Sequence, residues 1–188
     1  MNIFVLHPEP GRAARMMCDK HIPKMVVETM QMLGSAVIRH GAHPEDMPLT
    51  SQGTPLKGGY HKHPCTVWAG ETRANYDWLC RHGFGLLNEY RLRFDKIHAC
   101  REAIEWLSHM AHFIPQGGGE MTPFAQAMPE QYKSDKAHYA YRAYYASEKA
   151  HFAKWERGTP APDWWEPYLE AVEMGMFGDD EKMPDIFK

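Results

Sequence analysis

The sequence lacks several features that mark common protein classes. Its four cysteines are widely spaced and form no Cys-x-x-Cys pair, which argues against a zinc knuckle or a disulfide framework and favours buried thiols. No apolar run approaches the roughly 20 residues that a membrane-spanning helix needs. There is no basic excess either, because 21 lysines and arginines stand against 24 acidic residues. The net charge of −3 argues against broad, non-specific nucleic-acid binding but leaves room for a local basic groove.

Motifs for several kinds of catalysis are also missing. No Gly-x-Ser-x-Gly element supports a serine hydrolase, and the glycines at 117–119 lack the Lys-Ser/Thr of a phosphate-binding loop. The twelve histidines include three closely spaced pairs, but none forms a His-Glu-x-x-His pattern. We therefore expect neither a metal nor another cofactor. The first residues show no secretory signal, so a cytoplasmic location is the default expectation.

The fold expected from this sequence is all-α. With 188 residues and 44% hydrophobic content, we expect a single compact helical domain over residues 1–176 and an acidic, loosely ordered tail over 177–188. Residues 2–6 predict one short N-terminal strand or an extended segment tucked into the core. Loops are expected over 41–64 and 114–123. Helices are expected over residues 12–18, 19–33, 64–82, 85–94, 99–112, 137–155 and 164–174.

The segment 19–33 has the most informative pattern. Asp19 is a reasonable N-cap, and Pro23 in the first turn means either that the helix begins near residue 20 or that a longer helix kinks there. Such a helix has one apolar side, while Lys20, His21, Lys24, Glu28 and Gln31 gather on the other. This face could hold a phosphate through its lysines while the carboxylate accepts protons or stabilises a developing cation. The alternative is a solvated face with i,i+4 contacts.

Two further clusters precede the centre of the chain. His63, Trp68, Asn75 and Trp78 surround the start of a helix, where two indoles and an amide could bind a planar base, although core packing explains the indoles equally simply. Arg93, Lys96 and His98 at a helix end could clamp a phosphate. Alternatively, Glu89 and Arg93 pair with each other at i,i+4.

The last cluster lies on the helix expected over 137–155. Arg142 and Lys149 are seven residues apart and share one face, which is the polar one. A separate aromatic stripe is expected to face the core, and it consists of Tyr141, Tyr145, Phe152 and Trp155.

Three segments resemble those of a set of small phage and bacterial proteins. They read DKH…K…E…Q at 19–31, HPC..W…N..WL at 63–79 and YR.YY…K…W…P.W at 141–164. More distantly, the layout is similar to the phage pyrimidine-dimer DNA glycosylase/AP lyase of the endonuclease V type. In that family a histidine precedes a catalytic glutamate by seven residues, and His21 and Glu28 reproduce this spacing. The later family positions are matched here by His63, Leu79, Arg81, Glu89, Lys149 and Trp164.

This resemblance implies an all-α N-glycosidase acting on DNA or a modified nucleotide. In the implied mechanism an α-amine attacks C1′ to form a Schiff base, and the glutamate stabilises the sugar cation and assists β-elimination. Asn2 is expected to retain Met1, which makes the Met1 amine the nucleophile, and α-amines titrate near about 8. The candidate catalytic residues are Glu28, His21 and Met1. The candidate phosphate- or substrate-binding residues are Lys20, Lys24, Gln31, His63, Asn75, Trp78, Arg93, Lys96, His98, Arg142 and Lys149.

Other functions stay open at this stage. Enzymes of that family are basic, and the slightly acidic balance here favours a nucleotide or modified base over duplex DNA. The alternatives are a transferase or hydrolase on modified nucleotides, and a non-enzymatic phage protein that binds a nucleotide or a host protein. A Glu28→Gln variant would keep the function of such a binding protein and would lose most of the rate of an enzyme. No membrane partner is expected, the location for a phage protein would be the host cytoplasm, and the oligomeric state stays open.

Overall fold

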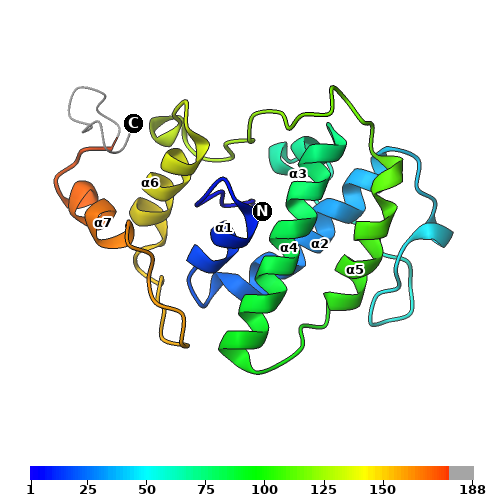
Figure 1. Cartoon of the computed structure of the whole chain (residues 1–188), viewed down its shortest axis with the longest axis horizontal. Coiled ribbons are helices and arrows are strands. Elements are labelled where there is room, and N and C mark those ends of the chain that lie inside the picture. Colours follow the sequence, from blue (N-terminus) through cyan, green and yellow to red (C-terminus); the bar gives the residue numbers. More distant parts are fainter. Residues whose placement is uncertain (178–188) are drawn as a thin grey trace.

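The structure is a computed structural model that describes residues 1–177, and every regular element in that part of the chain is helical (Figure 1). An isolated bridge between Leu49 and Pro55 is the only β-type pairing there, so the all-α single-domain prediction is confirmed. No helix in the same range is long and apolar enough to cross a membrane. The tail expected over 177–188 falls almost wholly outside the described residues. The α-helices are α1 (Pro10–Met16), α2 (His21–Arg39), α3 (Pro64–Ala69), α4 (Arg73–Phe94), α5 (Arg101–His109), α6 (Ala137–Lys149) and α7 (Trp165–Glu173).

Helix α4 is the element on which α1, α2, α3 and α5 pack. It runs without a break through the glycines at 83 and 85, where the sequence predicted an interruption. Gly85 instead allows a close helix crossing, because a Cβ there would lie 2.9 Å from the Cβ of Ala14 and 3.2 Å from the Cα of Gly11 in α1. The actual interruption comes earlier, where Gly70 caps α3 and the Thr72 side chain caps α4 by accepting from the amide of Asn75.

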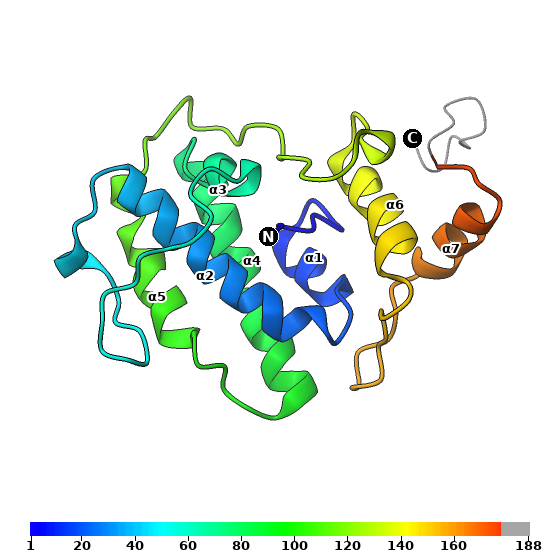
Figure 2. The same ribbon diagram turned by 180° about the vertical axis from the view of Figure 1, so that it is seen from behind.

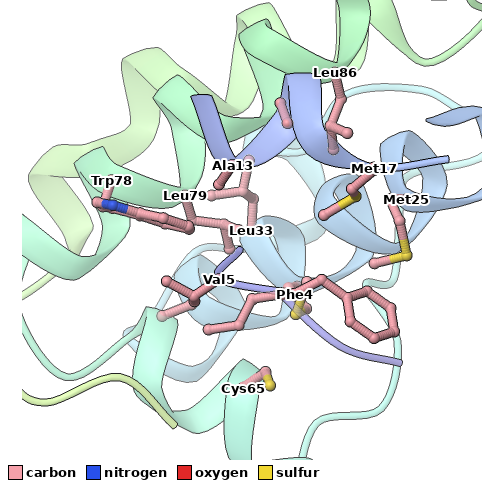
Figure 3. Close-up of a cluster of buried hydrophobic side chains, with 14 of the residues drawn as sticks. Phe4, Val5, Ala13, Met17, Met25, Leu33, Cys65, Trp78, Leu79 and Leu86 are labelled. Atoms are coloured by element: carbon pink, nitrogen blue, oxygen red, sulfur yellow. The ribbon is translucent and has the colours of Figure 1, made fainter. Parts of the chain in front are cut away.

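Residues 2–6 form no strand. They are tucked into the core instead, with the side chains of Ile3, Val5 and Leu6 fully buried. Figure 3 shows Val5 among side chains of α1, α2 and α4. Phe4 has a positive φ of 34°, a conformation that costs a non-glycine residue about 1–3 kcal/mol. Stacking of the Phe4 ring on His21 at 4.9 Å and on Tyr144 at 6.3 Å, measured between ring centres, offsets part of that cost. The turn at Phe4 therefore anchors the N-terminal segment against α2 and α6.

Helix α2 begins at His21, so Pro23 occupies its first turn, where the missing N–H leaves no hydrogen bond unmade. Asp19 does not cap this helix. Its carboxylate instead accepts from the guanidinium of Arg93 at 3.0 Å and from the backbone N–H of Glu156 at 2.7 Å. The chain after α6 has to leave the helix to reach Asp19, which explains why α6 ends at Lys149 instead of near residue 155.

Helices α6 and α7 pack together on the side of the molecule opposite α5, and the N-terminal segment lies between α6 and the bundle around α4 (Figures 1 and 2). As predicted, Tyr141 and Tyr145 on α6 are fully buried. The loops expected over 41–64 and 114–123 contain only a short 3-10 turn at Pro44–Asp46. All four cysteines are free, and three of them are buried.

Candidate active site

Glu28 lies in the middle of α2 and points at the first two residues of the chain. Its Oε2 accepts a hydrogen bond from the backbone N–H of Asn2 at 3.0 Å and lies 3.8 Å from the α-amino nitrogen of Met1. The Glu28 side chain is 12% exposed, so it is sheltered but can be reached from solvent. A second cation, Lys24, places its Nζ 3.6 Å from Oε1. The carboxylate thus lies between an α-amine and an ammonium group.

A pocket of about 180 Å³ opens beside this carboxylate. Seven residues apart, His21 and Glu28 both line it, so the two-turn spacing on α2 does place them on one face. Lys149 reaches the same pocket from α6, with its Nζ 3.4 Å from the hydroxyl of Tyr144. We call this the Glu28 pocket; it is lined by Met1, Asn2, Phe4, His21, Lys24, Glu28, Tyr144, Lys149 and Phe152.

His21 is a neutral, firmly held group at the wall of this pocket. Its Nδ1 is 2.7 Å from the hydroxyl of Tyr145, and its ring stacks on Phe4. Burial, reinforced by the nearby Lys24, Lys149 and Lys20, lowers the pKa of His21 to about 3. An imidazole with such a pKa carries no charge at neutral pH, so it can exchange hydrogen bonds with a ligand but cannot attract a phosphate by charge.

Two more predicted residues lie close to the Glu28 pocket. The side chain of His63 caps α3 by accepting from the backbone N–H of Cys65, which leaves its other ring nitrogen to carry the proton. Burial and then the charge of the Met1 amine lower the pKa of His63, while Glu28 acts in the opposite direction, so His63 feels both groups. Lys20 holds its ammonium 4.6 Å from the centre of the Phe152 ring at the pocket edge.

Arg93 is saturated by protein acceptors away from this pocket. Its fully buried guanidinium contacts Glu89 at 2.8 Å and Asp19 at 3.0 Å, and it donates to the carbonyls of Met17 and Arg15. The pairing of Glu89 with Arg93 is therefore the alternative that the structure bears out. No donor of Arg93 is left for a phosphate.

The indole–amide cluster is likewise structural. The fully buried Asn75 donates to Trp68 and Thr122 and accepts from the amide of Thr122. Trp78 is 2% exposed and donates from its ring N–H to the carbonyl of Pro8. Neither side chain can bind a base without giving up these bonds.

The remaining predicted residues are dispersed. Gln31 packs beneath the backbone of Gly59, Lys96 is exposed beyond the end of α4, and His98 packs edge-on against Tyr90. Arg142 donates to the carbonyl of Leu6 and lines a different pocket from Lys149. We therefore leave these four residues, together with Arg93, Asn75 and Trp78, out of the Glu28 pocket.

The sequence did not single out Asn2, Tyr144 or Tyr145 as site residues. Asn2 contributes a backbone N–H, which every non-proline residue has and which carries no sequence signal. The two tyrosines lie in a dense aromatic run, YRAYY, where the pattern does not distinguish the ring that lines a pocket from those that fill the core. Within residues 1–177 no group of three or more histidine, cysteine or acidic side chains is arranged to hold a metal ion.

A comparison with known protein families gives one match. The family model described as pyrimidine dimer DNA glycosylase matches residues 1–102, which is more than half of the chain. This range contains Met1, His21, Lys24, Glu28 and His63, whereas Lys149 lies beyond it. Neither the curated proteins nor the solved structures contain a match. On the strength of the family match, the chain belongs to the pyrimidine dimer DNA glycosylase family.

Proposed function

We propose that this protein is a DNA N-glycosylase with an associated lyase step, and that the reaction takes place in the Glu28 pocket. The observation that carries the proposal is the pairing of the Met1 α-amine with the Glu28 carboxylate at 3.8 Å, at the wall of an open pocket. A nucleophile beside a sheltered carboxylate is the arrangement that covalent N-glycosidase chemistry requires. Family membership supports the same reaction class.

The proposed chemistry begins with the deprotonated Met1 amine attacking C1′ of a damaged nucleotide. The N-glycosidic bond breaks, its electron pair leaves with the base, and the base takes up a proton. Ring opening, with a proton transferred from the amine nitrogen to O4′, then gives an iminium ion. Glu28 next removes a proton from C2′, and the C3′–O bond breaks with the phosphate leaving as an anion. The carboxylate therefore has two roles, because it stabilises the developing sugar cation first and accepts a proton later.

The cations of the pocket suit a phosphate that flanks the reacting sugar. Lys24 reaches the pocket from α2 and Lys149 from α6, so the two ammonium groups approach it from different elements. A phosphate oxygen forms strong charge-assisted hydrogen bonds with such groups. Neutral His21, held by Tyr145, would position the sugar through a hydrogen bond without competing for the phosphate.

The test uses duplex oligonucleotides that contain either a UV-induced pyrimidine dimer or an abasic site. We expect strand cleavage, and we expect borohydride to trap a covalent protein–DNA adduct. Glu28→Gln keeps the size of the side chain but removes its basicity, and should lower the rate by about 10²- to 10⁴-fold. The matched control is Glu105→Gln, which changes a half-exposed carboxylate on α5 that pairs with Arg101.

Three outcomes would decide the matter. The full proposal is supported if the unmodified protein cleaves the DNA and forms a trapped adduct, and if Glu28→Gln loses both activities while Glu105→Gln keeps them. Base release without any adduct contradicts the amine mechanism and leaves a hydrolytic glycosidase. Full activity of Glu28→Gln contradicts the assignment of the Glu28 pocket.

A further inference from the structure

A second pocket, of about 510 Å³, lies between α1, α6 and the segment that leads into α7. Three arginines line it, two from α1 and one from α6. We call it the arginine pocket; it is lined by Arg12, Arg15, Met16, Arg142, Pro160, Ala161, Pro162, Asp163 and Trp164. No residue of the Glu28 pocket is among them.

The three guanidinium groups of this pocket outnumber its one lining carboxylate, that of Asp163. Within residues 1–177 none of them forms an ion pair with a carboxylate, although Asp163 lines the same pocket. Other arginines of the chain do pair, for example Arg73 with Asp77 and Arg101 with Glu105. In a chain with a net charge of −3, three unpaired arginines around one pocket form a local excess of positive charge.

Arg142 is fixed in place at the base of this pocket. Its Nε donates to the carbonyl of Leu6 at 2.9 Å, and its guanidinium lies 5.5 Å from the ring centre of Trp164 and 5.7 Å from that of Tyr139. Arg12 and Arg15 are exposed and three residues apart, so they extend from one face of α1. One held and two exposed guanidinium groups can surround an anion, and the held one loses little side-chain entropy when it does so.

The pKa values of two neighbouring histidines are lowered in part by the positive charge of these arginines. The pKa of His138 is lowered to about 4 by burial and then by Arg142, and the pKa of His7 is lowered by burial and then by Arg12 and Arg142. Glu9, whose carboxylate caps α1, acts on His7 in the opposite direction, and the capping hydrogen bonds and Arg12 lower the pKa of Glu9 in turn. Both histidines are therefore neutral at pH 7, and the charge available to a ligand is that of the arginines.

The two pockets are joined by the same pieces of chain. Lys149 and Arg142 lie seven residues apart on α6, which is about 10 Å along the helix axis. The N-terminal segment bridges them too, because Phe4 lines the Glu28 pocket and the carbonyl of Leu6 binds Arg142. Successive phosphates of one strand advance by about 3.4 Å along a DNA axis, so two sites about 10 Å apart would contact different phosphates of the strand.

We propose that the arginine pocket binds a backbone phosphate of the DNA strand, within a few nucleotides of the nucleotide held in the Glu28 pocket. The anion would be clamped by Arg142 from α6 and by Arg12 and Arg15 from α1. This assignment rests on the proposed function, which places a DNA strand at the Glu28 pocket. It explains how a protein without a general basic excess could hold DNA, since three arginines from two helices meet at one pocket.

The test measures the binding of a duplex carrying a stable abasic-site analogue, in the Glu28→Gln background, so that no chemistry intervenes. Arg12→Ala/Arg15→Ala should weaken binding roughly tenfold or more and should lower the slope of log Kd against log salt by about 1, between about 50 and 200 mM salt. The charge-matched control is Arg73→Ala/Arg101→Ala, which removes two partly exposed arginines of α4 and α5 that pair with Asp77 and Glu105. A trinucleotide with a central abasic analogue is too short to reach the arginine pocket and should bind both double variants equally.

The results separate the proposal from its competitors. The proposal is supported if only the α1 double variant loses duplex affinity and salt dependence while its binding of the trinucleotide is unchanged. Equal losses in both double variants would show a general charge effect and overturn it, and so would a trinucleotide that loses as much affinity as the duplex. Failure of the proposed function is a separate result, since it would appear as absence of cleavage by the unmodified protein, whereas this test reads binding alone.

Discussion

Replacing Arg93 by methionine should destabilise the protein severely. The guanidinium lies in a buried cluster in which it neutralises Glu89 and Asp19 and donates to two backbone carbonyls. Thr159 donates to the same Glu89 oxygen, so the cluster joins α1, α2 and α4 to the segment after α6. Methionine would fill much of the volume but leave two buried carboxylates without a counter-charge.

The magnitude follows from the chemistry of buried ion pairs. Removing one partner of such a pair costs about 3–5 kcal/mol, against about 0–1 kcal/mol for an exposed pair. For a chain of this length, 1 kcal/mol shifts the melting temperature by about 2–4 °C, so Arg93→Met should lower it by about 6–20 °C. Thermal unfolding followed by circular dichroism measures the shift, and urea unfolding measures the free energy.

Two companion variants make this prediction refutable. Arg101→Met breaks an exposed pair with Glu105 and should lie within about 1 kcal/mol of the unmodified protein. The triple variant Asp19→Asn/Glu89→Gln/Arg93→Met removes all the charges together and should recover part of the loss. If Arg93→Met melts like Arg101→Met but loses DNA affinity, the arginine binds substrate and the structural role argued above is wrong.

The other predictions concern packing and pH. Gly85→Ala should destabilise the fold by about 1–2 kcal/mol, because its Cβ would meet Ala14 at 2.9 Å. The control is Gly118→Ala, whose Cβ would meet nothing within 4 Å and which should change the free energy of unfolding by less than about 0.5 kcal/mol. Equal effects of the two substitutions would refute the close crossing of α1 and α4. For His21, a folded-state pKa of about 3 against an ordinary 6.5 means that protons bind the unfolded state more tightly, so stability falls as the pH drops from about 6.5 toward 3. This residue alone should lower the free energy of unfolding by about 2 kcal/mol between neutral pH and pH 5. In His21→Gln, the free energy measured by urea unfolding should therefore depend less steeply on pH. An unchanged pH dependence would contradict a buried, neutral imidazole.

Helix periodicity gave the fold class and most elements of this protein in advance. The face of α2 was predictable because the positions of His21, Lys24 and Glu28 follow from 100° per residue alone. The interruption predicted between residues 82 and 85 was wrong because helix propensity penalises glycine, whereas the tertiary structure uses Gly85 to let α1 approach. Asp19 was a plausible N-cap by residue type, but its carboxylate forms an ion pair with Arg93, which is distant in sequence, and does not cap α2.

The site was predictable only in part, for a related reason. Arg93, Asn75 and Trp78 have side chains that suit phosphate or base binding, yet each is fully engaged inside the protein. Sequence shows which groups are present but not which of them have already found a partner in the fold. The Asn2 N–H on Glu28 and the meeting of α6 with the N-terminal segment depend on contacts across more than 20 residues of chain, which no local pattern encodes.

The most direct test of the account locates the bond that forms during the reaction. After borohydride trapping on abasic DNA, the protein is digested and the modified peptide is identified by mass spectrometry. Pairing of the Met1 amine with Glu28 predicts that the sugar remnant is attached to the α-nitrogen of Met1, and that prior acetylation of this amine abolishes trapping. An adduct on the side chain of Lys24 or Lys149, or undiminished trapping after acetylation of the α-amine, would contradict the central claim.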